Sequence, residues 1–128
     1  MLSGLRYGYF WWLFGWCAVA AALVLSLLPS SAPVLPHWND KLQHALGYFL
    51  LTFWFCGIYP RQRYWLVALA MFGMGVLVEV LQGVMHLGRQ AEWRDLLADA
   101  VGIVPAVLLA LTPLGQWPRW IEALIRRA

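Results

Sequence analysis

Four long apolar stretches account for most of this 128-residue chain, and they constrain its fold more than any other feature. Hydrophobic residues make up 62% of the sequence and charged residues only 12%. Soluble domains are usually about half apolar and about one quarter charged. The sequence therefore predicts a membrane protein with a single domain over residues 1–128, and it leaves no room for a separate soluble catalytic domain.

Each apolar stretch is expected to form a membrane-spanning helix. A helix of about 20 residues, at about 1.5 Å per residue, crosses a hydrocarbon core of roughly 30 Å. Pro60 and two arginines make a very short connection between the second and third stretches, so these two helices should be antiparallel neighbours. The predicted fold class is an all-α membrane protein, a four-transmembrane-helix bundle with spans at about 7–28, 41–59, 64–85 and 96–111.

A different pattern follows Pro113 and predicts a C-terminal amphipathic helix at the membrane interface, over about residues 117–127. Glu122 and Arg126 have the i,i+4 spacing of a favourable surface ion pair. The alternative is a frayed basic tail, because a short helix is marginal unless the bilayer supports it. The apolar side would consist of Trp117, Trp120, Ile121, Leu124 and Ile125, and the polar side of Arg119, Glu122, Arg126 and Arg127.

Basic residues are divided unevenly between the two sides that four alternating spans would define. The side with both termini would hold six of the nine Lys and Arg residues, and the opposite side would hold only Lys41, Arg89 and Arg94. The positive-inside rule then places both termini in the cytoplasm. The basic surplus indicates contact with anionic membrane lipids rather than with nucleic acid. Whether the chain forms a homo-oligomer is left open.

Polar residues occur at matching depths on three of the predicted spans. Spacings of three or four residues place those of each span on one helix face. Because the spans alternate in direction, these residues should meet in one layer in the outer leaflet of the membrane. They are Asp40, His44 and Tyr48 on the second span, Glu79 and Gln82 on the third, and Asp95 and Asp99 on the fourth.

An acidic residue inside a membrane span is costly, about 2.5–3.5 kcal/mol at the centre of a helix and less near its end. Glu79 and Asp99 are therefore expected to face other helices and to find partners there. Simpler interpretations stay open for several neighbours. His44 can be an interfacial residue, Asp40 and Asp95 can cap helices, and the nearby basic residues can reach the lipid head groups.

Three motifs resemble those of the VanZ-like membrane proteins, in the same order and with similar spacing. They are DKLQHALGYFLL from Asp40, EVLQG from Glu79 and RQAEWRDLLADAVG from Arg89. The resemblance covers about residues 25–102. It implies a bacterial multi-pass protein of the cytoplasmic (inner) membrane, in a family named for a member that lowers susceptibility to the glycopeptide teicoplanin. That family usually has Asn where this chain has Asp99, so the amide donor is missing here.

The leading hypothesis is a non-enzymatic envelope protein that binds the polar head of an amphiphile, such as a lipid or a lipid-linked ligand, in the outer leaflet. Basic residues would meet anionic groups, Tyr48 and Gln82 would give directional hydrogen bonds, and Glu79 with Asp99 would orient the basic side chains. The predicted ligand-binding cluster consists of Asp40, Lys41, His44, Tyr48, Glu79, Gln82, Arg89, Arg94, Asp95 and Asp99.

The second hypothesis is a small intramembrane hydrolase that acts on a lipid phosphate or ester. His44 would be its general base or acid, with Glu79, Asp95 and Asp99 as partners or as ligands of a divalent ion. No HExxH, GxSxG or paired-cysteine motif is present, so the sequence identifies no catalytic residue, no metal site and no cofactor. A proton-coupled carrier that uses Glu79 and His44 is the third hypothesis, for which four spans leave little room.

Overall fold

The computed structural model describes residues 4–27, 40–85 and 93–127, and within these ranges the chain forms five α-helices and no strand. The prediction of an all-α protein is therefore confirmed for the described residues. The helices are α1 (Gly8–Leu27), α2 (Asp40–Ile58), α3 (Tyr64–Met85), α4 (Trp93–Ala110) and α5 (Trp117–Arg127).

The helix boundaries follow the predicted stretches closely, with the largest difference at the start of α4. That helix begins at Trp93, before the apolar run, and Asp95 lies in its first turn. An acidic residue there is favoured by the partial positive charge of the helix N-terminus. Hydropathy locates only the apolar part of a helix, so it placed this boundary at residue 96.

Two helical segments, Gly8–Ser26 and Arg61–Val84, are long and apolar enough to cross a membrane. A third can be added if Arg94–Ala110 and Pro113–Arg127, which are bent by 83°, form one broken span. The apolar part of α2 is shorter, Leu42–Ile58, because polar residues occupy the start of that helix. The helices thus have the length and composition of a membrane protein, and the four-span bundle stays a prediction.

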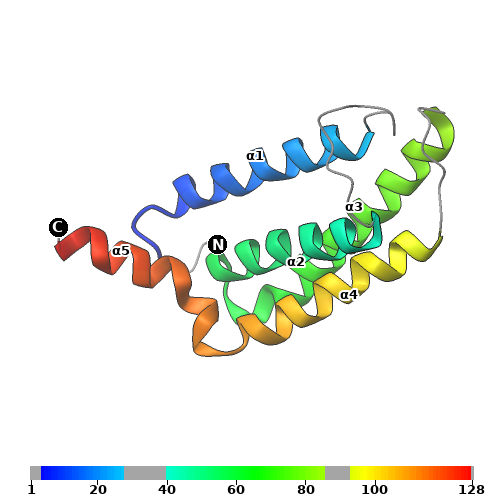
Figure 1. Cartoon of the computed structure of the whole chain (residues 1–128). Helices are drawn as coiled ribbons and strands as arrows, with labels where there is room; N and C mark the ends of the chain where they lie inside the picture. The colour runs from blue at the N-terminus through cyan, green and yellow to red at the C-terminus, as the bar shows by residue number, and fades with distance from the viewer. Residues whose placement is uncertain (1–3, 28–39, 86–92, 128) are drawn as a thin grey trace.

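Helix α2 packs most extensively against α4 and also contacts α1 and α3 (Figure 1). Gly102 permits the close approach of α4 to α2, because a Cβ atom at this position would lie only 2.0 Å from the backbone oxygen of Ala45. Small residues at such crossings are typical of helices that pack in a membrane. This close contact fixes the relative height of the polar residues that α2 and α4 carry.

The four longer helices alternate in direction, so that the end of α1, the start of α2, the end of α3 and the start of α4 lie at one end of the molecule (Figure 1). We call this the polar end. At the opposite end the chain turns at Thr112, passes through a short 3-10 turn (Pro113–Gln116) and enters α5. We call this the α5 end.

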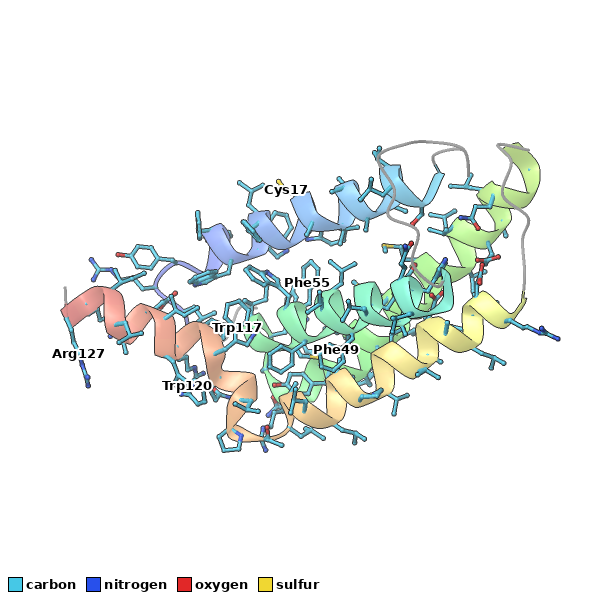
Figure 2. All side chains as sticks on the ribbon, viewed as in Figure 1. Cys17, Phe49, Phe55, Trp117, Trp120 and Arg127 are labelled. Atoms are coloured by element: carbon cyan, nitrogen blue, oxygen red, sulfur yellow. The ribbon has the colours of Figure 1, made fainter. Side chains whose placement is uncertain are left out.

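The α5 end contains an aromatic core. The ring of Trp117 lies 4.5 Å from that of Trp54 and 5.4 Å from that of Trp11 between centroids. Figure 2 shows Trp117 and Phe55 directed toward the interior, and Phe55 is only 3% exposed. Large apolar side chains also cover the outside, among them Tyr9, Phe10 and Leu13 of α1. An exposed apolar surface of this kind suits contact with lipid acyl chains.

Candidate functional site

Among the side chains that the structure describes, six polar ones gather at the polar end, and five of them are buried. We call this set the polar cluster. Because its members come from three helices, tertiary packing rather than local spacing brings them together. His44 is partly buried, and the five buried members are Tyr48 from α2, Glu79 and Gln82 from α3, and Asp95 and Asp99 from α4.

His44 lies between two aspartates of α4. Its Nδ1 atom is 3.0 Å from Oδ1 of Asp99, which is hydrogen-bonding distance. Its Nε2 atom is 3.9 Å from Oδ2 of Asp95, which is too long for a hydrogen bond but close enough for an ionic interaction. If Nδ1 carries the proton, it donates to Asp99 and leaves the lone pair of Nε2 directed toward Asp95. The Asp99 carboxylate can thus select the tautomer of His44.

Gly75 of α3 provides the space in which Asp99 sits. A Cβ atom at residue 75 would lie 2.3 Å from Oδ2 of Asp99 and 3.6 Å from the hydroxyl oxygen of Tyr48. Asp99 is only 1% exposed, and its Oδ2 atom makes no hydrogen bond to any residue that the structure describes. A carboxylate oxygen in such a position is costly without a compensating partner.

Glu79 and Gln82 extend the cluster along α3. The side-chain nitrogen of Gln82 donates to the backbone oxygen of Ser26 at 2.7 Å, which ties α3 to the end of α1. Glu79 is 7% exposed, and one of its carboxylate oxygens, one ring nitrogen of His44 and one carboxylate oxygen of Asp95 lie within 4.8 Å of one another. The leading sequence hypothesis had no metal site, and the second considered Glu79, Asp95 and Asp99 as ligands of a divalent ion. The structure instead places His44, Glu79 and Asp95 where they could hold a metal ion.

The remaining four residues predicted for the site, Asp40, Lys41, Arg89 and Arg94, have no side chain that the structure places in the polar cluster. Arg94 is exposed at the start of α4. Arg89 lies outside the described residues, and Asp40 and Lys41 are described only as backbone at the start of α2. The polar cluster therefore consists of one imidazole, three carboxylates, one phenol and one amide among the side chains that the structure describes.

Glu122 is a buried carboxylate outside the polar cluster, at the α5 end, and its position corrects the sequence prediction. It was expected on the polar side of an interfacial helix, yet it is only 2% exposed. Its two oxygens accept hydrogen bonds from the backbone nitrogens of Arg6 and Tyr7, at 2.8 and 2.9 Å, and from the indole nitrogen of Trp11, at 2.8 Å. The carboxylate thus caps the start of α1, which has no acidic residue in its own first turn.

The electrostatics of Glu122 match this capping role. Burial alone would raise the pKa of its carboxyl group, but hydrogen bonds from Tyr7, Trp11 and Arg6 and the positive charge of Arg126 outweigh burial and lower the pKa below its ordinary value. The predicted proximity of Glu122 and Arg126 thus contributes to the lowered pKa, although the main partners of Glu122 belong to the N-terminal part of the chain. The absence of an acidic residue from the first turn of α1 was the only sequence signal that could have revealed these partners of Glu122.

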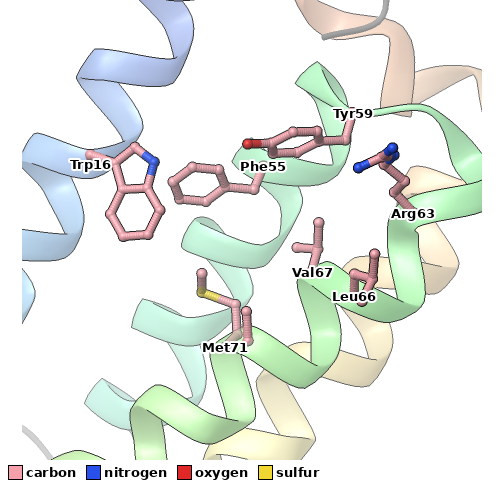
Figure 3. A pocket seen from close by; sticks show the side chains of 8 residues that line it. Trp16, Phe55, Tyr59, Arg63, Leu66, Val67 and Met71 are labelled. Carbon is pink, nitrogen blue, oxygen red and sulfur yellow. The ribbon is translucent and has the colours of Figure 1, made fainter. Parts of the chain in front are cut away.

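An apolar pocket of about 230 Å³ lies between α1, α2 and α3 (Figure 3). Trp16, Phe55, Val67 and Met71 form much of its wall, and Arg63 lies at its edge. No residue of the polar cluster lines this pocket. The two features are therefore separate parts of the molecule.

No protein-family model matches the chain, and no curated protein or solved structure matches it either. The resemblance to the VanZ-like proteins accordingly stays a prediction from three sequence motifs. Arguments about function depend on the polar cluster itself.

Proposed function

We propose that this chain is a multi-pass protein of the bacterial inner membrane that binds the polar head group of an amphiphile at the polar cluster. The observation that carries the proposal is the convergence of the buried carboxylates of Glu79, Asp95 and Asp99 on the ionisable side chain of His44 at one end of the molecule. Ionisable residues in a membrane protein are costly and commonly mark a binding or transport site. This function agrees with the VanZ-like resemblance, which supplies the bacterial envelope as its setting.

The groups of the cluster suit a ligand that carries hydroxyl, phosphate or carboxylate groups. Gln82 uses its amide nitrogen to hold Ser26, which leaves its carbonyl oxygen as an acceptor. Tyr48 can donate from a hydroxyl that lies near Asp99. Arg94, which lies at the same end, would meet anionic groups of the head, and the sequence predicts the same role for Arg89.

The orientation that we propose puts both termini in the cytoplasm and the polar end in the outer leaflet. It follows from the distribution of basic residues along the four spans. A cysteine introduced at residue 90 should react with a membrane-impermeant maleimide in intact cells. Reaction only after the cells are permeabilised would reverse the orientation.

The proposed function is tested by native mass spectrometry of protein purified in a mild detergent. Wild type should carry a bound amphiphile, and Glu79→Gln should lose it, because this change removes the charge and keeps the shape of the side chain. Glu122→Gln makes the same chemical change at the other end of the molecule, and it should keep the ligand. Equal occupancy in all three proteins, or no bound amphiphile in wild type, would contradict the proposal.

One observation favours hydrolysis as a second candidate function. The contact between His44 Nδ1 and Asp99 Oδ1 is the arrangement in which a carboxylate orients an imidazole that acts as a general base. An intramembrane hydrolase of lipid phosphates or esters would release product from vesicles of defined composition, and His44→Gln would abolish the release. A ligand that is bound but never turned over would favour the binding protein.

A further inference from the structure

Three side chains of the polar cluster lie close enough together to bind one ion. His44 comes from α2, Glu79 from α3 and Asp95 from α4, and each presents a nitrogen or oxygen atom within 4.8 Å of those of the other two. Two ligand atoms that each lie about 2.1 Å from one metal ion are separated by about 3–4 Å. The 3.9 Å between His44 Nε2 and Asp95 Oδ2 falls in this range, although it is too long for a direct hydrogen bond.

The other ring nitrogen of His44 is already held. It lies 3.0 Å from Oδ1 of Asp99, so a proton on Nδ1 places the lone pair that can coordinate an ion on Nε2. Metal-binding histidines almost always donate their second nitrogen to a carboxylate or carbonyl group, which fixes the ring and makes the ligand more basic. Asp99 would therefore be a positioning residue that acts through His44.

The buried charge gives an independent reason for a cation. Asp99 is 1% exposed, and its Oδ2 atom has no hydrogen-bond partner among the described residues. Together with Glu79 and Asp95 it places three buried carboxylates beside the imidazole of His44. Buried carboxylates in such numbers are stabilised by cations or by protonation.

We propose that His44, Glu79 and Asp95 bind a divalent transition-metal ion, of the zinc or manganese class, with Asp99 holding His44 in place. One imidazole with carboxylates favours these ions over Mg²⁺ and Ca²⁺, which prefer oxygen ligands alone. Three protein ligands leave a coordination position open. The inference rests on the proposed function, because the ion would hold a phosphate or carboxylate oxygen of the head group in that position.

The experiment uses the full chain in detergent, stripped with EDTA, reloaded with Zn²⁺ or Mn²⁺ in separate samples, and washed. Elemental mass spectrometry should find about one ion per chain in wild type with one of the two metals. Asp95→Asn and His44→Gln should bind that metal at least 10-fold more weakly, because even the loss of a residue that only orients a metal ligand typically costs about 10-fold or more. Glu122→Gln, which alters a buried carboxylate outside the cluster, should bind it like wild type.

Thermal melting keeps the test valid if a variant is less stable. Added metal should raise the melting temperature of wild type and of Glu122→Gln, and it should leave that of Asp95→Asn unchanged. No retained metal in wild type, or equal retention by Asp95→Asn and Glu122→Gln, would overturn the inference. Loss of the bound metal in Arg89→Ala and Lys41→Ala but not in Asp95→Asn would overturn it as well.

Failure of this inference can be told apart from failure of the proposed function. An amphiphile that stays bound after EDTA treatment, in protein that takes up neither metal, would refute the metal site and leave the binding function intact. Metal bound with the expected variant pattern, in protein that never carries an amphiphile, would support the metal site and refute the binding function.

Discussion

In the part of the chain that the structure describes, buried acidic side chains occur at two sites, one at each end of the molecule, and the two sites differ in their partners. Glu122 at the α5 end accepts three hydrogen bonds from N–H groups, two of which belong to the backbone at the start of α1. At the polar end, Asp99 contacts the ionisable side chain of His44, and one of its oxygens has no hydrogen-bond partner among the described residues. Burial of an acid alone therefore does not indicate function, whereas the nature of its partners separates a structural cap from a candidate binding site.

The largest expected effect is on stability at the α5 end. Glu122→Ala leaves two backbone N–H groups and the indole of Trp11 without their acceptor, which should cost about 2–4 kcal/mol. We expect the melting temperature in detergent to fall by roughly 10 °C. Binding of amphiphile and metal at the polar end, measured below the melting temperature, should not change. An unchanged melting temperature would mean that Glu122 does not hold α5 against α1.

A second prediction concerns the space that Gly75 provides for Asp99. In Gly75→Ala the new methyl group would overlap Oδ2 of Asp99, so the carboxylate must shift from the position in which it contacts His44. Affinity for the metal ion should fall about 10–100-fold, as it does when an orienting partner of a metal ligand is lost. Gly73→Ala is the matched control on the same helix, because a Cβ atom at residue 73 meets nothing within 4 Å. Equal affinities for the two variants would show that Asp99 does not position His44.

The smallest expected effect is the pH dependence of the capping interaction. The pKa of Glu122 is lowered in the folded protein, so its ionised form contributes stability above about pH 4.5, the ordinary value, and loses that contribution as the pH falls through the lowered pKa. The difference in melting temperature between wild type and Glu122→Gln should thus be constant from pH 7 to about pH 5 and shrink at lower pH. A difference that grows on acidification would contradict the lowered pKa.

The helices were predictable because their signals are local. Apolar runs and the break at Pro60 placed α1, α2 and α3 to within a residue or so of the observed bounds. The similar depth of His44, Glu79 and Asp99 also followed from local information, since depth along alternating spans can be counted in residues. These features needed no knowledge of side-chain packing.

Other features could not be predicted because they depend on how distant segments meet. The bend of 83° after α4 returns α5 to the start of α1, and only this return buries Glu122. The close fit of Asp99 against Gly75 depends on the spacing of α3 and α4. The convergence of His44, Glu79 and Asp95 within 4.8 Å likewise requires that α2, α3 and α4 each have a particular rotation about the helix axis. Hydropathy does not specify that rotation.

The contrast between the two ends is tested most directly by melting curves and ligand occupancy measured together for Glu79→Gln and Glu122→Gln. Our account predicts that Glu79→Gln melts near wild type and loses the bound amphiphile, while Glu122→Gln melts earlier and keeps it. If Glu79 were instead one half of a structural ion pair, its loss would leave a buried charge unbalanced, at a cost of about 3–5 kcal/mol. A Glu79→Gln protein that melts as early as Glu122→Gln and still carries its amphiphile would contradict the account.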